Sequence, residues 1–323
     1  MQAQLKTNES DFKTVETHHW HDHHGPLLDA KNGFDVIDCK TCGFVHVTPI
    51  PTEKELEEIY RHEYYTDEKP LYIDRFIEDL EWWNIAYGDR YDTFEETLPK
   101  NRRRILDIGS GPGYFLKHGI DRGWDAVGVE PSKQAAAHAR SLGINVAEEF
   151  LDEKLAANLG QFDVIHLSEV LEHIPNPKKL LQIAHQMLAP GGIICAVVPN
   201  DYSPFQIALR NSCSFDPWWI AAPHHLNYFN KNSLENLINF TGFKTHLVES
   251  TFPIDLFLLM GENYIGNDPI GRSCHLRRIR FEKNLESAGM NNIKRKIYQA
   301  LANIDIGREV CIYGKKEIGD KND

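Results

Sequence analysis

The stretch that decides the fold reads RILDIGSGPGYF and occupies residues 104–115. Its first half is a short apolar run, which predicts a buried strand over residues 105–108. Three closely spaced glycines follow, and a helical pattern then covers residues 114–122. Glycine lets the backbone approach a ligand closely, and a helix N-terminus presents unpaired N–H groups. The stretch therefore predicts a strand, a tight turn and a helix that can hold a bound molecule between them.

The same alternation continues toward the end of the chain. The runs that predict strands are 105–108, 126–129, 144–147, 164–167, 193–198, 247–251 and 310–313, and those that predict helices are 114–122, 132–142, 152–159, 177–188 and 233–240. Short apolar strands that alternate with helices favour a mostly parallel sheet with helices on both faces. We therefore predict the α/β class with a doubly wound sheet, to which the run 310–313 adds an edge strand.

The spacing of the glycines separates two classes of cofactor. Gly109, Gly111 and Gly113 form G-x-G-x-G, whereas dinucleotide-binding proteins carry G-x-G-x-x-G. Pro112 also removes a backbone donor from the loop. An NAD-dependent oxidoreductase is therefore disfavoured. The loop instead resembles motif I of the class I S-adenosylmethionine-dependent methyltransferases, in which an acid such as Asp107 typically precedes the glycines.

Further features of that family follow in the family's order. Glu130 ends the second predicted strand, and residues 188–192, LAPGG, resemble the family's turn before its fifth strand. The resemblance implies S-adenosylmethionine as methyl donor and a Rossmann-like sheet of seven strands with an antiparallel edge strand. It also implies that Glu130 accepts hydrogen bonds from both ribose hydroxyls of the donor. The full set of cofactor-binding residues that it implies is Asp107, Gly109, Gly111, Gly113, Glu130, Glu149, Phe150 and Ser168.

A second group of polar residues follows the fourth predicted strand. Residues 169–173 read EVLEH, and helical spacing would place its acids and histidine on one face at the carboxyl end of the sheet, where such folds bind ligands. With a downstream histidine, this pattern resembles the ubiquinone-biosynthesis O-methyltransferases and the related small-RNA 3′-end 2′-O-methyltransferases, where such a set binds a divalent cation. The resemblance implies magnesium, manganese, iron or zinc on Glu169, Glu172, His173 and His225. The alternative is that His173, His225 and Glu169 act on the acceptor directly, with His173 as a general base.

The N-terminal region carries a third group. Cys39 and Cys42 form a CxxC pair, and five histidines lie between residues 18 and 24. The region resembles the N-terminal knuckle of several sugar-modifying methyltransferases, except that histidines replace the first pair of cysteines. One interpretation is a structural zinc on His21, His24, Cys39 and Cys42. The other is a CxxC without metal, with the histidines part of the active site.

These patterns suggest two parts of the chain. Residues 1–65 would form an N-terminal His/CxxC segment, which includes a helix over 53–61, and residues 66–323 would form the methyltransferase domain. A helical lead-in is predicted over 72–98. The insertion 201–229 is long and aromatic, which is typical of a lid. Its rings would either stack on a substrate or pack a small core of their own.

Composition narrows the functional classes. The 323 residues include 35 Lys and Arg against 47 Asp and Glu, a net charge of −12, which disfavours nucleic-acid binding. No apolar run is long enough to span a bilayer and residues 1–13 do not resemble a signal peptide, so we expect a cytoplasmic protein, which could form a homo-oligomer. The expected activity is methyl transfer to a small molecule, preferably a sugar or nucleotide-sugar of a polysaccharide or natural-product pathway. The alternatives are a metal-assisted O-methyltransferase on a phenol, quinone precursor or diol, and a catalytically silent protein that binds S-adenosylmethionine as a partner subunit.

Overall fold

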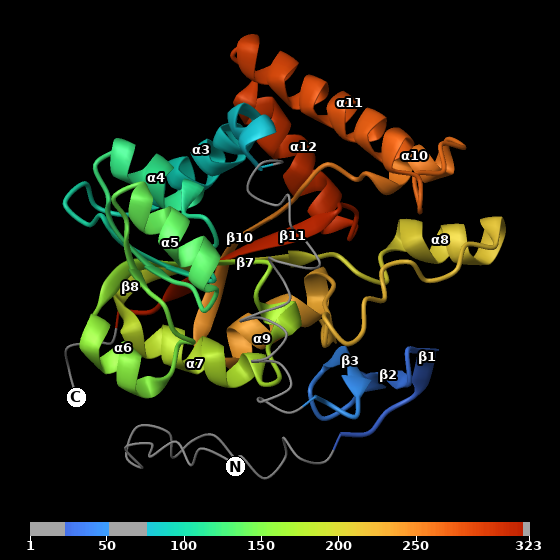
Figure 1. Ribbon diagram of the computed structural model, residues 1–323, viewed down its shortest axis with the longest axis horizontal. Helices are drawn as coiled ribbons and strands as arrows, with labels where there is room; N and C mark the ends of the chain where they lie inside the picture. Colours follow the sequence, from blue (N-terminus) through green and yellow to red (C-terminus); the bar gives the residue numbers. More distant parts are fainter. Residues whose placement is uncertain (1–22, 52–75, 319–323) are drawn as a thin grey trace.

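The computed structural model describes residues 23–51 and 76–318, whose strands form two sheets. The larger sheet has seven strands in the order β10-β11-β8-β7-β4-β5-β6 and lies at the centre of the molecule (Figure 1). Its strands are β4 (Arg104–Ile108), β5 (Asp125–Val129), β6 (Asn145–Ala147), β7 (Phe162–Ser168), β8 (Leu188–Pro199), β10 (Phe243–Ser250) and β11 (Glu309–Lys316). This arrangement confirms the predicted α/β class with a doubly wound, mostly parallel sheet.

The direction of the strands changes at one side of the sheet. The strands β8, β7, β4, β5 and β6 are parallel to one another, whereas β11 is antiparallel to both β8 and β10. The sequence predicts the run 310–313 at the edge, but the structure places it one position inward and puts β10 at the edge. The run is buried throughout, which requires cover that an edge position would not give it.

Helices cover both faces of the large sheet. The described helices are α3 (Leu80–Thr97), α4 (Tyr114–Asp121), α5 (Lys133–Ser141), α6 (Glu153–Leu159), α7 (Pro177–Met187), α8 (Pro204–Cys213), α9 (Lys231–Phe240), α10 (Asp255–Leu259), α11 (Asp268–Ser287) and α12 (Asn291–Asn303), of which α8, α10 and α11 lie away from this sheet. Figure 1 shows α3, α4, α5 and α12 on one side of the sheet and α6, α7 and α9 on the other. Several of these helices begin where polar side chains cap the first free N–H groups: Ser132 caps α5, Asp152 caps α6 and Asn176 caps α7.

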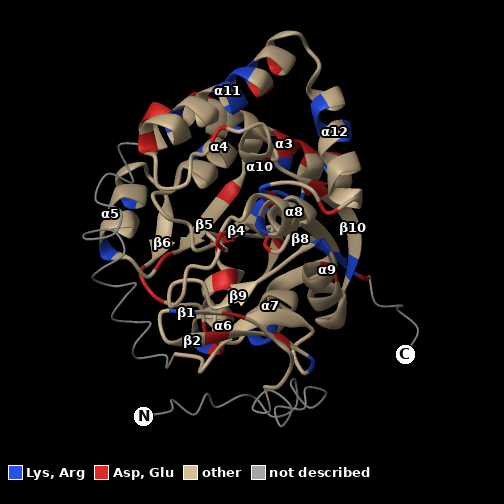
Figure 2. Cartoon of the chain, turned by 90° about the vertical axis from the view of Figure 1, so that its right-hand side faces the viewer, with Lys and Arg blue, Asp and Glu red and all other residues tan. Residues whose placement is uncertain are grey.

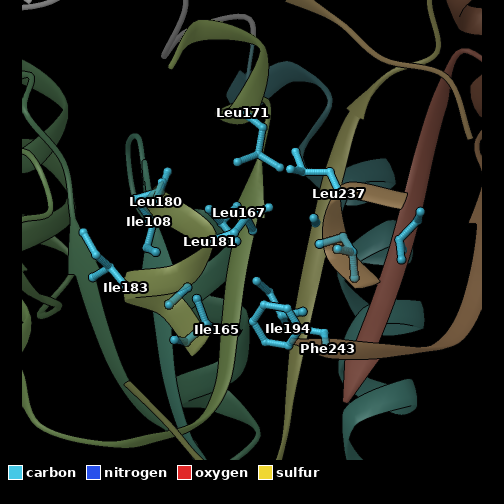
Figure 3. Packing of buried hydrophobic residues seen from close by; sticks show 14 of the residues in the cluster. Ile108, Ile165, Leu167, Leu171, Leu180, Leu181, Ile183, Ile194, Leu237 and Phe243 are labelled. Atoms are coloured by element: carbon cyan, nitrogen blue, oxygen red, sulfur yellow. The ribbon is translucent and has the colours of Figure 1, made fainter. Parts of the chain in front are cut away.

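The core consists of two apolar layers, one on each face of this sheet. In the layer that Figure 3 shows, Leu180 and Leu181 of α7 and Leu237 of α9 pack against Ile165 and Ile194 of the sheet. In the opposite layer, side chains of α3, α4 and α5 pack on the other face of the same strands. Burial on both faces explains why the sheet strands read as continuous apolar runs in the sequence.

The smaller sheet joins two distant parts of the chain. It has the order β1-β2-β3-β9, with β1 (Leu27–Lys31), β2 (Phe34–Cys39) and β3 (Phe44–Thr48) from the N-terminal segment and β9 (Asn227–Tyr228) from the insertion 201–229. Trp219 and Tyr228 of the insertion pack with Val36 and Val47 in a small core. These two rings therefore pack in a small core that the insertion shares with the N-terminal strands. The predicted helix over 53–61 and the boundary at residue 65 lie outside the described residues.

Among the C-terminal helices, α10 lies against α8, whereas α11 lies beside both α3 and α12 (Figure 1). Buried polar contacts join them: the indole of Trp82 donates to the Glu282 carboxylate at 2.7 Å, and the Tyr298 hydroxyl donates to the other oxygen of that carboxylate at 2.6 Å. Lys294 forms a buried ion pair with Asp89 at 2.6 Å. Figure 2 shows many Lys and Arg residues along α11 and α12. Among the described helices, none has the length and apolar character needed to cross a membrane.

Candidate functional site

The glycine loop between β4 and α4 adopts backbone angles that suit glycine. Gly109, Gly111 and Gly113 all have positive φ, at 72°, 52° and 89°. A side chain at Gly109 would also place its Cβ 2.6 Å from a methyl carbon of Val170, and one at Gly113 would lie 2.7 Å from the Cβ of Ala139. Both the conformation and the space thus exclude larger residues. The loop is therefore fixed as a close turn at the carboxyl end of β4.

Glu130 follows β5 and crosses to this loop. Its two carboxylate oxygens accept hydrogen bonds from the backbone N–H groups of Gly111 and Ser132, each at 2.8 Å, and the residue is only 4% exposed. Burial raises the pKa of Glu130 to about 7, against the effect of the two hydrogen bonds, and the charge of Asp107 adds to the rise. Each oxygen keeps a second lone pair. The carboxylate can therefore accept two further hydrogen bonds, as the two hydroxyls of a ribose would supply.

Asp107 is the last acid before the glycines and is 3% exposed. Its strand neighbour in β7 is His166, and the imidazole Nδ1 of that residue lies 2.7 Å from the Asp107 carboxylate. Burial lowers the pKa of His166, so the ring is neutral at neutral pH. The Asp107 carboxylate thus has a fixed hydrogen-bond partner, the His166 side chain of the adjacent strand β7.

The remaining predicted cofactor residues lie at the ends of neighbouring strands. Glu149 and Phe150 follow β6, the first exposed and the second half-buried, and Ser168 ends β7 with a half-buried side chain. The adjacent Glu148 forms an ion pair with Arg140 of α5 at 2.8 Å. All these residues lie at the carboxyl edge of the parallel strands, which is where open α/β sheets bind ligands.

Three of the four predicted acceptor-side residues come together after β7. Glu172 and His173 belong to a short 3-10 helix, η3 (Leu171–His173), and meet His225, with one carboxylate or imidazole atom of each within 4.8 Å of the others. The rings of His173 and His225 are nearly perpendicular with centroids 4.8 Å apart. The Nδ1–H of His173 donates to the His224 carbonyl at 2.7 Å, so in the neutral ring Nε2 carries the lone pair.

Glu172 is the most buried member of this cluster. It is 1% exposed, and neither carboxylate oxygen accepts a hydrogen bond from another residue in the described part of the chain. Burial raises the pKa of Glu172 well above its usual value, and the negative charge of Glu169 adds to the rise. A buried carboxylate without partners is costly unless a proton or a cation compensates its charge. The residue therefore fits a cation ligand.

Glu169 lies near this cluster but is not one of its members. The sequence predicts that it shares a helical face with Glu172 and His173, but no regular α-helix forms there. Glu169 instead adopts a left-handed φ of 54°, is exposed, and donates its backbone N–H to the Val197 carbonyl at 2.9 Å. A non-glycine residue with such a φ is uncommon and often marks a functional position.

The segment that carries His225 is held firmly to η3. The N–H of Leu226 donates to the Glu172 carbonyl at 2.7 Å. The side-chain amide of Asn227 donates to the carbonyls of Leu171 and Ile174, each at 2.8 Å. Because Asn227 also belongs to β9, the small sheet is connected directly to the histidine cluster.

A separate cluster lies in the N-terminal sheet. One atom each of His23, Cys39, Cys42 and His46 lies within 4.8 Å of the others. His23 Nδ1 is 3.0 Å from His46 Nε2, 3.3 Å from Cys42 Sγ and 3.8 Å from Cys39 Sγ. With Zn–N bonds of about 2.0–2.1 Å and Zn–S bonds of about 2.3 Å, ligand atoms of a tetrahedral site lie about 3.3–3.8 Å apart. The four residues therefore suit a tetrahedral Cys2His2 site.

The histidines of this cluster differ from those expected. The sequence pairs the two cysteines with His21 and His24, whereas the structure places His23 and His46 beside the thiols. His24 is exposed with its ring near the hydroxyl of Thr41, and His21 lies outside the described residues. Burial raises the pKa of the Cys42 thiol, and the neighbouring Cys39 adds to this effect. The spacing from Cys42 to His46, three intervening residues, is a metal-ligand spacing that could have been recognised.

The geometry can now be compared with known proteins. A family model described as "Methyltransferase domain" matches residues 83–248, just over half of the chain. The chain belongs to this family. The match confirms the expected class of enzyme, an S-adenosylmethionine-dependent methyltransferase domain.

Curated relatives match a shorter part. Ubiquinone biosynthesis O-methyltransferase of Escherichia fergusonii is 33% identical over 96 residues, which cover 28% of this chain and 40% of that protein. The protein of the same name from Escherichia coli (strain K12 / DH10B) gives the same identity and coverage. This chain thus spans well under half the length of the curated relatives it matches.

The chain is also similar to solved structures of methyltransferases. The plantazolicin methyltransferase BpumL, in complex with a monoazolic desmethylPZN analog and SAH, has a TM-score of 0.50 at 16% identity and covers 82% of this chain and 97% of its own. A SAM dependent methyltransferase from Archaeoglobus fulgidus has a TM-score of 0.47 at 18% identity, with 75% and 99% covered. At these identities the likeness concerns the fold alone.

Proposed function

We propose that this protein transfers a methyl group from S-adenosylmethionine to a small-molecule acceptor. One observation carries the proposal. The glycine loop and the buried Glu130 meet at the carboxyl edge of the sheet, and the cluster of Glu172, His173 and His225 lies at the same edge, after the adjacent strand β7. S-adenosylmethionine supplies an activated methyl group on a positively charged sulfur. The chain binds that donor through the loop and Glu130, and holds the acceptor beside η3.

The residues on the acceptor side suit proton removal. His173 donates its Nδ1–H to a backbone carbonyl, which fixes the ring and its tautomer, so that Nε2 is the basic nitrogen, as a general base requires. His225 lies across from it, and Glu169 reaches the same edge from a fixed, unusual backbone conformation. In this proposal His173 takes the proton of the acceptor group, while His225 and Glu169 orient the acceptor.

Our preferred acceptor is a sugar or a nucleotide-activated sugar of a polysaccharide or natural-product pathway. The support is the resemblance of the N-terminal CxxC segment to that of sugar-modifying methyltransferases. The four-residue cluster of that segment fits a structural zinc, which would staple β1, β2 and β3 together. In this proposal residues 1–65 form a metal-stapled segment, and residues 66–323 form the methyltransferase domain.

A second candidate is a metal-assisted O-methyltransferase on a phenol, quinone precursor or diol. The observation that favours it is the buried carboxylate of Glu172, whose oxygens accept no hydrogen bond from another described residue and lie beside two imidazoles, with one oxygen 4.0 Å from His173 Nε2. Two nitrogen ligands and one carboxylate suit zinc or manganese better than magnesium. The named relatives, ubiquinone biosynthesis O-methyltransferases, also support this candidate.

One experiment distinguishes these candidates. The purified protein is incubated with S-adenosylmethionine carrying a labelled methyl group, and with either nucleotide-sugars or catechols, each with added manganese or with a chelator. We expect label in the sugar fraction whether or not the chelator is present. Label in catechols that depends on manganese would support the second candidate. Donor binding without transfer to any acceptor would indicate a silent partner protein.

A further inference from the structure

A buried chain of three polar side chains lies behind the proposed donor site. Arg90 of α3 points a guanidinium nitrogen to His166 Nε2 at 3.0 Å, and His166 Nδ1 lies 2.7 Å from the Asp107 carboxylate. The three residues are 7%, 2% and 3% exposed. They come from three different elements, α3, β7 and β4, so the fold as a whole assembles the chain.

The hydrogen-bonding groups on either side of His166 fix its protonation state. A guanidinium only donates hydrogen bonds, so His166 Nε2 must accept and must carry no proton. Its Nδ1 then carries the hydrogen and donates to Asp107. Phe115 of α4 stacks on the imidazole with centroids 3.8 Å apart, which fixes the ring plane. The result is a neutral imidazole locked in one tautomer and one orientation.

This arrangement has a specific electrostatic consequence. A direct contact between Arg90 and Asp107 would place a cation against the carboxylate and neutralise it locally. The neutral imidazole between them instead orients the carboxylate through a hydrogen bond and keeps its negative charge available. Asp107 lies on β4, between the ribose-binding Glu130 after β5 and the acceptor cluster after β7. The amino-acid part of the donor, with its ammonium group, would lie over this strand.

We propose that Arg90 and His166 are positioning residues, which hold Asp107 as an oriented carboxylate for the ammonium group of the methyl donor. This inference rests on the proposed function. Neither residue touches the donor in the arrangement described, and each acts through Asp107. The inference predicts that Arg90 and His166 matter for ligands that contain the amino-acid part and not for ligands that lack it.

The test compares two ligands by calorimetry: S-adenosylhomocysteine, which has the amino-acid part, and 5′-methylthioadenosine, which lacks it. We expect His166→Phe and Arg90→Leu to weaken S-adenosylhomocysteine binding about tenfold, as for the loss of one hydrogen bond to a charged group, and to leave 5′-methylthioadenosine binding unchanged. Arg90→Lys keeps a donor and should restore most of the affinity. Lys294→Met, which removes another buried contact of α3, should lower the melting temperature without changing either affinity.

The outcomes separate the two proposals. Equal weakening of both ligands, or no change in either, would overturn the positioning role while the wild-type binding upheld the donor site. A wild-type protein that binds neither ligand would overturn the proposed function and this inference with it. If His166→Phe and Arg90→Leu do not fold, the positioning role is tested by the two ligand affinities of Arg90→Lys and by the nitrogen chemical shifts of His166. A proton on Nε2 in place of Nδ1 would contradict the inference.

Discussion

Glu130 shows how the burial of one side chain can set the pH dependence of ligand binding. In the free protein its carboxylate receives two backbone hydrogen bonds and no cation among the described residues, and its pKa is raised to about 7. Ribose hydroxyls that donate to the carboxylate would stabilise its charged form. A group whose pKa is high in the free protein and lower in the complex makes binding stronger as pH rises.

Donor binding should therefore depend on pH through Glu130. We expect the affinity for S-adenosylhomocysteine to be constant above about pH 7.5 and to fall by up to tenfold for each pH unit below about 7, since one proton must leave on binding. Calorimetry between pH 5.5 and 8.5 measures this slope. Glu130→Gln should bind more weakly at pH 8 and show a much smaller slope. A wild-type affinity that is flat over this range would contradict the assignment.

Glu172 gives a second prediction, which concerns metal. If its buried carboxylate is a ligand in the cluster with His173 and His225, Glu172→Gln should weaken manganese binding by at least about tenfold. Titration followed by electron paramagnetic resonance measures the affinity. Glu235→Gln, on the surface of α9, serves as the control with an equal change of charge. Identical manganese affinity in all three proteins would remove the metal-assisted candidate and leave His173 as a metal-free base.

The strands of the small sheet are short, and we expect the cluster of His23, Cys39, Cys42 and His46 to contribute more to its stability than strand pairing does. The strands β1, β2, β3 and β9 have 5, 6, 5 and 2 residues, and a sheet of this size has little apolar area to stabilise it. His46 of β3 pairs in register with Asn227 of β9, which in turn holds η3. A metal on His46 would thus stabilise both this sheet and the segment that carries His225.

Removal of one thiol should weaken the zinc site and the small sheet without changing the binding of the methyl donor. We expect Cys42→Ser to lose one equivalent of zinc and to lower the melting temperature by roughly 5–10 °C. Affinity for S-adenosylhomocysteine should not change, because the glycine loop belongs to the other sheet. His24→Ala is the matched control, since that histidine is exposed and lies outside the four-residue cluster. Equal zinc content in both variants would refute this ligand set.

Helices α3 and α12 are joined by an ion pair that should be sensitive to pH. Lys294 is 1% exposed and contacts Asp89, and burial raises the pKa of Asp89 to about 6 even with that lysine beside it. Lys294→Met leaves a buried carboxylate without its cation, which we expect to cost about 3 kcal/mol of unfolding free energy at pH 8. The loss should be smaller at pH 5, where Asp89 is protonated. Urea unfolding at the two pH values checks this; an equal loss at both would contradict it.

At the scale of the whole molecule, some features can be predicted from short stretches of sequence. The inner parallel strands β4, β5, β7 and β8 were predictable because most of their residues are buried, so each contains an apolar run that ends in a turn or a polar residue. The closeness of Glu130 to the loop Gly109–Gly113 was predictable because one strand–helix–strand unit, β4-α4-β5, carries both.

Other features depend on contacts between distant segments. The pairing of β9 with β3 joins residues almost two hundred positions apart, and a two-residue strand has no periodicity to recognise. The position of β11 inside the sheet follows from its pairing with both β8 and β10, which the local pattern of 310–313 does not contain. Arg90 and His166 looked like ordinary helix and strand residues, since only the fold brings them to Asp107.

The most direct test of this account is a crystal structure of the protein with S-adenosylhomocysteine. The account predicts that both ribose hydroxyls lie within hydrogen-bond distance of the Glu130 carboxylate, that the ammonium group faces Asp107, and that the sulfur points toward His173 and His225. A ligand bound elsewhere, or bound at the loop with its sulfur turned away from that histidine pair, would contradict it.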